Sequence, residues 1–534
     1  MPTAPYRDPS RPVDERVEDL LARMTLAEKA GQLFHTRVAM NGDGTLAETT
    51  DGPFPRQGTT ELVVDGRLTH FDLVGRYGIR ETAEWVNRLQ ALAADTRLGI
   101  PVTLSTDPHY SFTDNPGTAF GSGASFTSGA SFTSGASFGS GVFSAWPEPL
   151  GLAAIGDPDL VEKFGDTVRR EYLAVGFRVA LHPQIDLSAE PGQARRAGTF
   201  GSSAEVASAL VRAYVRGLQG PRLGPRSVAA MVKHSPGGTT HDHRPAPLRA
   251  AVEAGCAQLM PPTDMPRERL GFDGVVRTDW GLLTDAPTNG EPHMALATVS
   301  ERAAKALDAG ADQFGGEQCP EVIVELVRSG RITQERVDAS VRRLLREKFV
   351  LGLFERRYVD PDRAEETVGA ADFIALGEAA QRRSLTVLTN HSLLPLTDRP
   401  NLYVEGVAAQ TASLYGNVVA DPAHADVAVL RLRTPHEARL TEILALLTAV
   451  PTLVCVNLER PAVLPEIAAK AAALVVDYGA SDTALLDVAF GRARAEGRLP
   501  FALPRSTPAS EASRPDAPNA PKAPVFPYGH GLSL

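Results

Sequence analysis

A chain of 534 residues is too long for one ordinary hydrophobic core, so the sequence predicts two or three domains. Its content of 43% hydrophobic and 22% charged residues is typical of a soluble globular protein. The net charge of −10 argues against a nucleic-acid or anionic-membrane partner, because an acidic surface attracts neither.

The N-terminal residues 1–16 contain no apolar stretch of the kind found in secretory signals, and no apolar run is long enough to span a bilayer. Cys256, Cys319 and Cys455 lie far apart in apolar or helical contexts. This pattern is typical of buried thiols in a reducing compartment and not of a disulfide framework or a zinc site. We therefore expect a cytoplasmic protein.

The first elements along the chain are predicted to be two helices, and a strand–helix alternation follows from about residue 99. Val17, Leu20, Leu21 and Met24 share one helical face, and residues 25–28 form a capping box that opens the second helix. Later strand candidates are 101–105, 177–181, 228–232, 257–260, 274–277 and 311–314, and helical patterns between them include 160–175, 204–218 and 301–309. Apolar strands that alternate with amphipathic helices in this number favour a TIM-like (β/α) barrel.

One segment of the barrel region has low complexity. Residues 118–141 contain four copies of a six-residue unit, TAFGSG, ASFTSG, ASFTSG and ASFGSG. Gly/Ser runs form flexible chains, so we interpret the repeat as a mobile loop on the face that follows Asp107. A hydrophobic lid or an aggregation-prone surface formed by its phenylalanines are the alternatives.

A second α/β region follows the predicted helix 334–351. Its strand candidates are 385–388, 402–404, 427–432, 453–456 and 474–476, again separated by helices. The tail from Arg505 is rich in Pro, Ala and Ser before it closes on FPYGHGLSL. The sequence thus predicts a barrel domain over 1–355, a linker over 356–380 and a second domain with a C-terminal tail over 381–534.

Polar side chains gather where the predicted barrel strands end. They are Asp107, His109, His182, Lys233, His234 and Asp279. The carboxyl ends of all strands in such a barrel meet at one face, and that face carries the chemistry. We therefore expect the active site at these residues.

The stretch GFDGVVRTDWG, residues 271–281, is the most specific of these strand ends. Its acid, Asp279, is followed by the large aromatic Trp280. A carboxylate at the mouth of a buried strand, beside a ring that can lie against a sugar, is what a glycosidase nucleophile needs. An aspartate that caps the next helix is the structural alternative. For Lys233 and His234 the corresponding alternative is an ordinary polar strand end.

Several segments match a known family in both sequence and order. They are RVEDLLARMTLAEKAGQLF, GIPVTLSTD, WPEPLGLAA, GTFGSSAE, VKHSPGG, GVVRTDWG, RVDASVRRLLREKFVLGLF, GRLPFALP and FPYGHGL. With these segments the chain resembles glycoside hydrolase family 3 over almost its whole length. The resemblance implies a TIM-like barrel followed by an α/β sandwich domain, with the active site between them. It also implies retaining hydrolysis of β-linked sugars, usually glucosides.

The resemblance implies a role for each matching residue. Asp279 matches the nucleophile, and Lys233 and His234 match the pair that holds hydroxyls of the sugar in the −1 subsite. Asp107 matches the acid that binds the outer hydroxyls of the same ring. Arg195 matches an arginine of that subsite, although PGQAR stands here where the family has a stretch like PRWGR. As surface charge, Arg195 would have no such role.

The acid/base has more than one candidate. Glu437 stands where the family implies a glutamate of the second domain, and Glu405 and Glu459 are further candidates at strand ends. In the loop SPGGTTHDHRPAP, Asp242 could instead orient His243, as in the branch of the family that acts on N-acetylglucosaminides. A solvated polar loop or adventitious metal binding is the structural alternative for this dyad.

We therefore predict a retaining β-glucosidase that releases terminal sugars from short oligosaccharides or small glycosides through a glycosyl-aspartate intermediate. Two carboxyl-type groups complete this chemistry, so it needs no metal and no organic cofactor. The alternatives are a catalytically weakened sugar-binding relic, a β-N-acetylglucosaminidase, and an interaction scaffold built on the Phe/Gly/Ser repeat. A homo-oligomer is compatible with the sequence.

Overall fold

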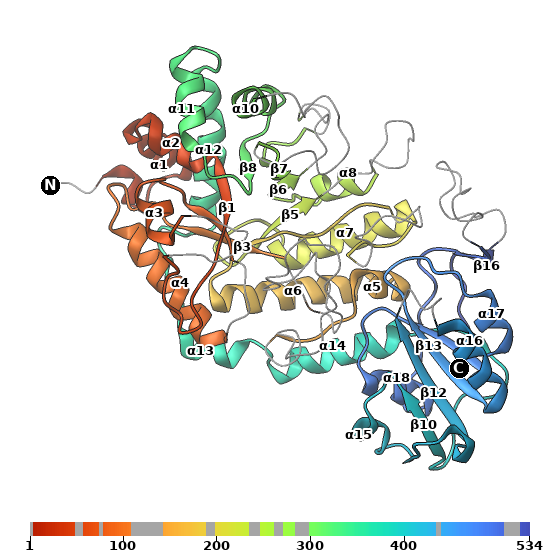
Figure 1. Cartoon of the computed structure of the whole chain (residues 1–534). Helices are drawn as coiled ribbons and strands as arrows, with labels where there is room; N and C mark the ends of the chain where they lie inside the picture. The colour runs from red at the N-terminus through yellow and green to blue at the C-terminus, as the bar shows by residue number, and fades with distance from the viewer. Residues whose placement is uncertain are drawn as a thin grey trace.

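The computed structural model describes residues 4–48, 57–73, 78–107, 110, 143–187, 198–233, 246–260, 267, 271–283, 298–433, 439–506 and 524–533. Within these ranges, eight parallel strands close into a barrel (Figure 1). They pair in chain order, and β8 returns to β1. Their bounds are β1 (Phe34–Val38), β2 (His70–Leu73), β3 (Thr103–Thr106), β4 (Val179–Ala180), β5 (Ala229–Lys233), β6 (Gln258–Met260), β7 (Val275–Trp280) and β8 (Gln313–Gly315). The predicted TIM-like barrel is confirmed.

The barrel begins earlier than the sequence analysis expected, because β1 and β2 precede residue 99. Their inward positions are polar, with His35 and Arg37 on β1 paired in register with His70 and Asp72 on β2. Hydrophobic periodicity does not detect a strand whose buried side chains are charged or aromatic-polar. The two strands complete the closure and bring four titratable groups into the barrel.

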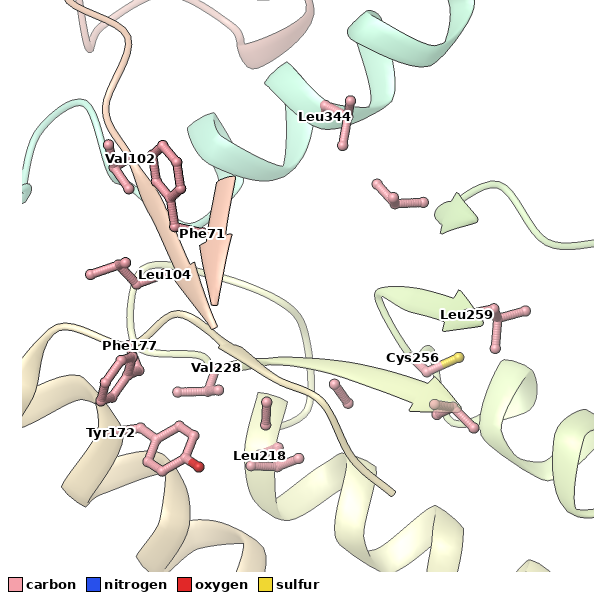
Figure 2. Close-up of a cluster of buried hydrophobic side chains, with 14 of the residues drawn as sticks. Phe71, Val102, Leu104, Tyr172, Phe177, Leu218, Val228, Cys256, Leu259 and Leu344 are labelled. Carbon is pink, nitrogen blue, oxygen red and sulfur yellow. The ribbon is translucent and has the colours of Figure 1, made fainter. Parts of the chain in front are cut away.

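Helices surround the barrel and bury its outer apolar layer. They are α1 (Val13–Arg23), α2 (Leu26–Gln32), α3 (Thr59–Val64), α4 (Ile79–Ala94), α5 (Pro149–Ile155), α6 (Pro158–Val175), α7 (Ala204–Gln219), α8 (Ala246–Glu253), α10 (Val299–Asp308), α11 (Pro320–Arg328) and α12 (Gln334–Val350), after the 3-10 turn η1 (Pro5–Arg7). The predicted capping box at Thr25 is present, with the Thr25 side chain accepting from the Glu28 amide. Figure 2 shows part of this layer, where Phe71 of β2, Tyr172 of α6, Leu218 of α7 and Leu344 of α12 surround the strands.

The second sheet has six strands in the order β11-β10-β12-β13-β14-β9, and all pairs except β14–β9 are parallel. The strands are β9 (Thr386–Asn390), β10 (Asn401–Glu405), β11 (Asn417–Val418), β12 (Val427–Arg433), β13 (Thr452–Asn457) and β14 (Ala473–Asp477). Alternate residues of β12–β14 enter two separate apolar clusters, one with α16 (Leu440–Ala449) and α17 (Pro465–Lys470), the other with α15 (Ala409–Ala412) and α18 (Asp482–Ala489). Helices therefore cover both faces, which confirms the α/β sandwich. The turn η2 (Pro422–His424) and the pair β15 (Leu503–Pro504) and β16 (Pro524–Phe526) complete this region.

The connection between the two sheets is helical. Residues 356–380, predicted as a linker, carry α13 (Pro361–Thr367) and most of α14 (Ala371–Ser384). The first of these packs on α4 and α6, and the second packs on α5 and α18 (Figure 1). The segment is thus packed along its length, while the domain boundaries themselves stay a prediction.

Backbone hydrogen bonds join the two domains directly. The Glu148 amide donates to the Tyr478 carbonyl over 2.8 Å, and the Ser202 amide donates to the Pro500 carbonyl over 2.9 Å. The neighbouring Gly201 has a φ of +80°, and a Cβ there would lie 2.5 Å from the Pro500 oxygen. Only glycine allows this approach, so the GTFGSSAE segment fixes how the barrel meets the second domain. Among the described residues, no helix combines the length and apolarity required to cross a bilayer.

The two residues that flank the segment 111–142 lie together in the core. Tyr110 and Phe143 pack edge to face with ring centroids 5.6 Å apart, and the Trp146 amide donates to the Tyr110 carbonyl over 2.5 Å. The Tyr110 ring also lies 5.7 Å from Phe164 of α6. The repeat, and with it the prediction of a mobile loop, lies outside the described residues. The two flanking residues, Tyr110 and Phe143, are buried and in contact.

Because these two flanking residues are held independently of the chain between them, deletion of residues 124–135 should leave the fold intact. Shortening such a connection changes the closure entropy by only about 0.4 kcal/mol. The urea midpoint of this variant should therefore equal that of the intact chain. Phe143→Ala, which removes one ring of the Tyr110–Phe143 pair (the aromatic neck), should in contrast cost about 3 kcal/mol. A large loss of stability from the deletion alone would show that the repeat takes part in the core.

Glu171 of α6 is a buried carboxyl that ties three segments together. It accepts hydrogen bonds from the Ser144 amide (3.0 Å), the Ser144 hydroxyl (3.2 Å) and the Gly369 amide (2.9 Å). Burial raises the pKa of Glu171 to about 7, although these hydrogen bonds act in the opposite direction. The folded protein therefore holds a proton here that the unfolded chain releases.

Because the pKa of Glu171 is higher in the folded protein than in the unfolded chain, the free energy of unfolding falls as pH rises. The contribution of the proton on Glu171 is fully present below pH 4.5, the ordinary pKa, and is lost as the pH passes about 7. Compared with Glu171→Gln, the wild type should lose up to about 1.4 kcal/mol of unfolding free energy per pH unit between pH 5 and 7. Urea unfolding at several pH values measures this difference. Glu162→Gln, an exposed change on the same helix, should leave the pH dependence unaltered. A constant offset between wild type and Glu171→Gln would contradict the shift.

Candidate active site

The structure brings three of the predicted polar strand ends together. Asp107 follows β3 and Lys233 ends β5, and the Lys233 Nζ donates to Asp107 Oδ1. His182, just after β4, places its Nε2 3.9 Å from the same carboxylate oxygen. Lys233 and His182 are buried, at 8% and 3% exposure. Three consecutive strands of the barrel therefore converge on one carboxylate, as expected for strands that end at a common face.

Neighbouring positive charge keeps the Asp107 carboxyl ionised. Burial alone would raise the pKa of this carboxyl, but the charge of Lys233 and that of His182 outweigh burial and hold the pKa below its ordinary value. An ionised carboxylate is an acceptor only, with lone pairs left over for further donors. Asp107 can therefore accept hydrogen bonds from neighbouring hydroxyls of a ligand while Lys233 holds it in place.

Asp279 lies near the carboxyl end of β7, on the same face of the barrel. Its Oδ1 accepts a hydrogen bond from the Trp280 amide over 2.8 Å. The helix-cap alternative is wrong for the described helices, because the next one, α10, is capped by Thr298. Asp279 is thus a strand residue whose carboxylate is oriented by the backbone that follows it.

A bulge in β7 sets the direction of Trp280. Arg277 pairs with Gln313 and Trp280 pairs with Gly315, so β7 carries one residue more than β8 between these pairs. The extra residue brings Arg277 and Trp280 to the same side of the strand, and bulges of this kind re-aim side chains near active sites. A Cβ on Gly315 would lie 2.9 Å from the Thr278 carbonyl. The bulge therefore depends on glycine in the neighbouring strand.

Two arginines lie against the Trp280 ring. The guanidinium carbons of Arg37 and Arg277 lie over the ring, 4.7 Å and 4.9 Å from its centroid. The His35 ring meets it edge-on at 5.8 Å. Cation–π contacts of this kind are stronger where water is excluded, so Trp280 is held firmly beside Asp279. Its predicted role in sugar binding stays a prediction.

A set of polar residues that was not expected from the sequence lies inside the barrel, and we call it the polar floor. Its members come from four strands and are His35, Arg37, Asp72, Ser105 and Arg277. A signal for them exists in the sequence, since polar residues two apart (HTR, HFD, RTD) are typical of one strand face. A search for runs of apolar residues does not detect that signal.

Hydrogen bonds define the protonation of the polar floor. Arg277 Nη1 is always a donor, so His35 Nδ1 accepts from it and the imidazole proton sits on Nε2, 2.7 Å from Ser105 Oγ. Burial and the Arg277 charge hold the pKa of His35 well below its ordinary value, which keeps the ring neutral. Ser105 Oγ lies 3.4 Å from Asp72 Oδ1, and Arg37 Nε lies 3.8 Å from Asp72 Oδ2. Burial raises the pKa of Asp72 to about 7, although the charge of Arg37 acts in the opposite direction.

Other predicted site residues lie outside the described residues, and their roles stay predictions. They are His109, Arg195, His234, Asp242, His243 and Glu437. Of the further acid candidates, Glu405 is ion-paired with Arg439 over 2.5 Å, and Glu459 follows β13 on the surface. Within the described ranges, neither is bonded to Asp107 or Asp279. The same ranges contain no group of three His, Cys, Asp or Glu side chains that could hold a metal.

Known proteins resemble the chain over its whole length. The family model described as the glycosyl hydrolase family 3 N-terminal domain matches residues 25–255 and 255–347. β-Glucosidase C of Emericella nidulans is 42% identical over 602 residues, covering 99% of this chain and 93% of the relative. A periplasmic β-glucosidase/β-xylosidase of Dickeya chrysanthemi is 36% identical over 617 residues, covering 99% and 91%. The solved structure of a β-glucosidase from Erythrobacter marinus shares the fold, with a TM-score of 0.78, 20% identity and coverage of 100% and 84%.

The buried pair gives a prediction on stability. Lys233→Met leaves the part-buried Asp107 without its ion-pair partner, and breaking a buried ion pair in this way costs up to about 3–5 kcal/mol. Asp107→Asn combined with Lys233→Met should recover part of that loss, because the stranded charge is then absent. Urea unfolding of the two single variants and the double variant measures the coupling. The exposed pair Arg216–Glu162 is the control, and Arg216→Met should cost less than about 1 kcal/mol. Additive effects of the two buried changes would contradict the coupling.

Proposed function

Because the chain belongs to glycosyl hydrolase family 3, it is a glycoside hydrolase, and we propose that it is a retaining β-glucosidase. Its substrates are short oligosaccharides or small glycosides with a terminal β-linked glucose. The observation that carries the proposal is the position of Asp279 at the mouth of the barrel that also holds the buried Lys233–Asp107 pair. A nucleophilic carboxylate and a carboxylate that binds hydroxyls then face one sugar from two sides of the same barrel.

In the proposed reaction, an Asp279 carboxylate oxygen attacks the anomeric carbon, and the bond to the leaving-group oxygen breaks. The leaving oxygen takes a proton from the acid, and a glycosyl ester on Asp279 results. Water, deprotonated by the residue that first served as the acid, then attacks the anomeric carbon, breaks its bond to Asp279 and releases the sugar with its original configuration. The Trp280 amide on Oδ1 fixes the plane of the carboxylate and leaves Oδ2 for the attack.

The Lys233–Asp107 pair would hold the sugar during these steps. Asp107 accepts from two neighbouring hydroxyls, and Lys233 donates to a hydroxyl with an N–H that Asp107 does not use. Positioning of this kind reduces the entropy lost at the transition state. His234, Arg195 and Trp280 are proposed as further contacts to the same sugar.

The acid is proposed to be Glu437, with the Asp242–His243 dyad as the second candidate. A retaining mechanism needs the donor roughly 5–5.5 Å from the nucleophile carboxyl. A dinitrophenol leaving group needs no protonation, so loss of the acid slows poor leaving groups selectively. Comparison of Glu437→Ala with His243→Ala on alkyl and dinitrophenyl β-glucosides therefore tells which residue is the acid.

The relatives described above do not favour the other functions. Both are named β-glucosidases, and one is also named a β-xylosidase. The matched stretch of 602 residues exceeds the 534 of this chain, so that relative carries segments with no counterpart here. Shortened loops of this kind, together with the lack of a secure acid/base, are what motivate the alternative of a sugar-binding relic. The cytoplasmic location stays a proposal, and the word periplasmic in one relative's name is the reason to test it by fractionation.

Covalent trapping tests the proposal. A 2-deoxy-2-fluoro-β-glucoside with a dinitrophenyl leaving group should add one fluoroglucosyl unit to the protein, and peptide mapping should place it on Asp279. Asp279→Asn should remove the labelling and lower kcat by several orders of magnitude, since the nucleophile is lost. Asp273→Asn is the matched control, because Asp273 is an exposed acid nearby in the same segment. Wild-type rates in the Asp279→Asn variant would refute the nucleophile assignment.

A further inference from the structure

Arg277 is a fully buried arginine inside the barrel, two residues before Asp279 in β7. Its Nη1 donates to the neutral His35, while Nε and Nη2 have no hydrogen-bond partner within the described part of the chain. No described carboxylate forms an ion pair with it. A buried guanidinium that is incompletely paired destabilises the folded state. Because Arg277 does not stabilise the fold in this way, we look for its role in the candidate active site, where Asp279 follows two residues later in β7.

Two contacts connect Arg277 to the Asp279 carboxylate. The guanidinium lies over the Trp280 ring, and the Trp280 amide donates to Asp279 Oδ1. The bulge in β7 makes this chain of contacts possible, because it brings Arg277 and Trp280 to one side of the strand. Arg37 lies over the same ring, but it also faces the carboxylate of Asp72.

We propose that Arg277 is a positioning residue for Asp279, with its charge and its contact on Trp280 holding the Asp279 carboxylate oriented for attack. The inference rests on the proposed function of Asp279. Three carboxyl groups, Asp72, Asp107 and Asp279, act on Arg277 through space. Burial lowers the pKa of Arg277 to about 10, so the guanidinium remains a cation at neutral pH.

Other charged or titratable groups face the same interior and are retained when Arg277 is substituted. They are His35 and Arg37 of β1, His70 and Asp72 of β2, Asp107 after β3, Lys233 of β5, Asp279 of β7 and Lys348 of α12. Two of them, His35 and His70, have pKa values held well below the ordinary value by burial. Without Arg277, the cations Arg37 and Lys233 remain, and both already face another carboxylate, Asp72 and Asp107 respectively.

The test is the rate of labelling by the dinitrophenyl 2-deoxy-2-fluoro-β-glucoside as a function of pH. Arg277→Met and Arg277→Gln remove the charge, and each should slow labelling by about 10- to 100-fold, the effect of a misplaced reacting group. The acidic limb of the pH profile should move up by about one unit, because a cation near the carboxylates is lost. Arg277→Lys keeps the charge, so its acidic limb should stay at the wild-type position.

Arg178 provides the matched control. It is a second buried arginine of the barrel, whose Nη2 donates to the Leu351 carbonyl over 2.6 Å, and burial likewise lowers the pKa of Arg178 to about 10. Arg178→Met, or Arg178→Lys if the first is recovered unfolded, should change stability and leave the acidic limb in place. Circular dichroism establishes that each variant is folded.

Two results would overturn the inference. One is folded Arg277→Met and Arg277→Gln variants with the wild-type labelling rate and acidic limb, and the other is an equal shift of the limb in the Arg178 variant. The proposed function fails differently, since a wrong nucleophile leaves the wild type itself unlabelled. The wild-type measurement therefore separates the two failures.

Discussion

The ion pair between Lys233 and Asp107 is the interaction on which the candidate site depends. It joins the ends of β3 and β5 across β4, and His182 of the intervening segment approaches the same oxygen. The carboxylate keeps its ion pair only while the strands that carry Asp107 and Lys233 end at one level. The hydroxyl-binding side of the site is therefore a property of the closed barrel and not of any single segment.

The interior beneath that pair is unusually polar for a barrel core. Parallel barrels commonly fill this layer with branched apolar side chains, whereas here His35, Asp72, Ser105 and Arg277 meet through hydrogen bonds. Such a layer fixes tautomers and side-chain directions more strictly than an apolar one, and it places net charge close to the reacting groups. The cost is a core that holds incompletely paired donors and a carboxyl near its midpoint of titration at neutral pH.

Features that depend on a local sequence pattern could be predicted, and features that depend on contacts between distant strands could not. Six barrel strands and the second sheet are local apolar patterns, and Asp107, Lys233 and Asp279 could be placed because they end such strands. The strands β1 and β2 were not predicted, because several of their buried residues are polar. The polar face of each strand leaves a signal in the sequence, but the contacts within the polar floor could not be predicted. Its members are far apart in the sequence and meet only after the barrel closes. The bulge that turns Trp280 depends on the register against Gly315, which a single strand does not reveal.

The aromatic neck at Tyr110 and Phe143 has a consequence for the history of the chain. Since the two residues that flank the segment 111–142 pack against each other in the core, selection for a folded barrel acts on those two residues and not directly on the number of repeat copies between them. Tandem repeats of this kind gain and lose units readily when genes are copied. Copy number can therefore change among descendants of this gene in an array that begins eleven residues after Asp107.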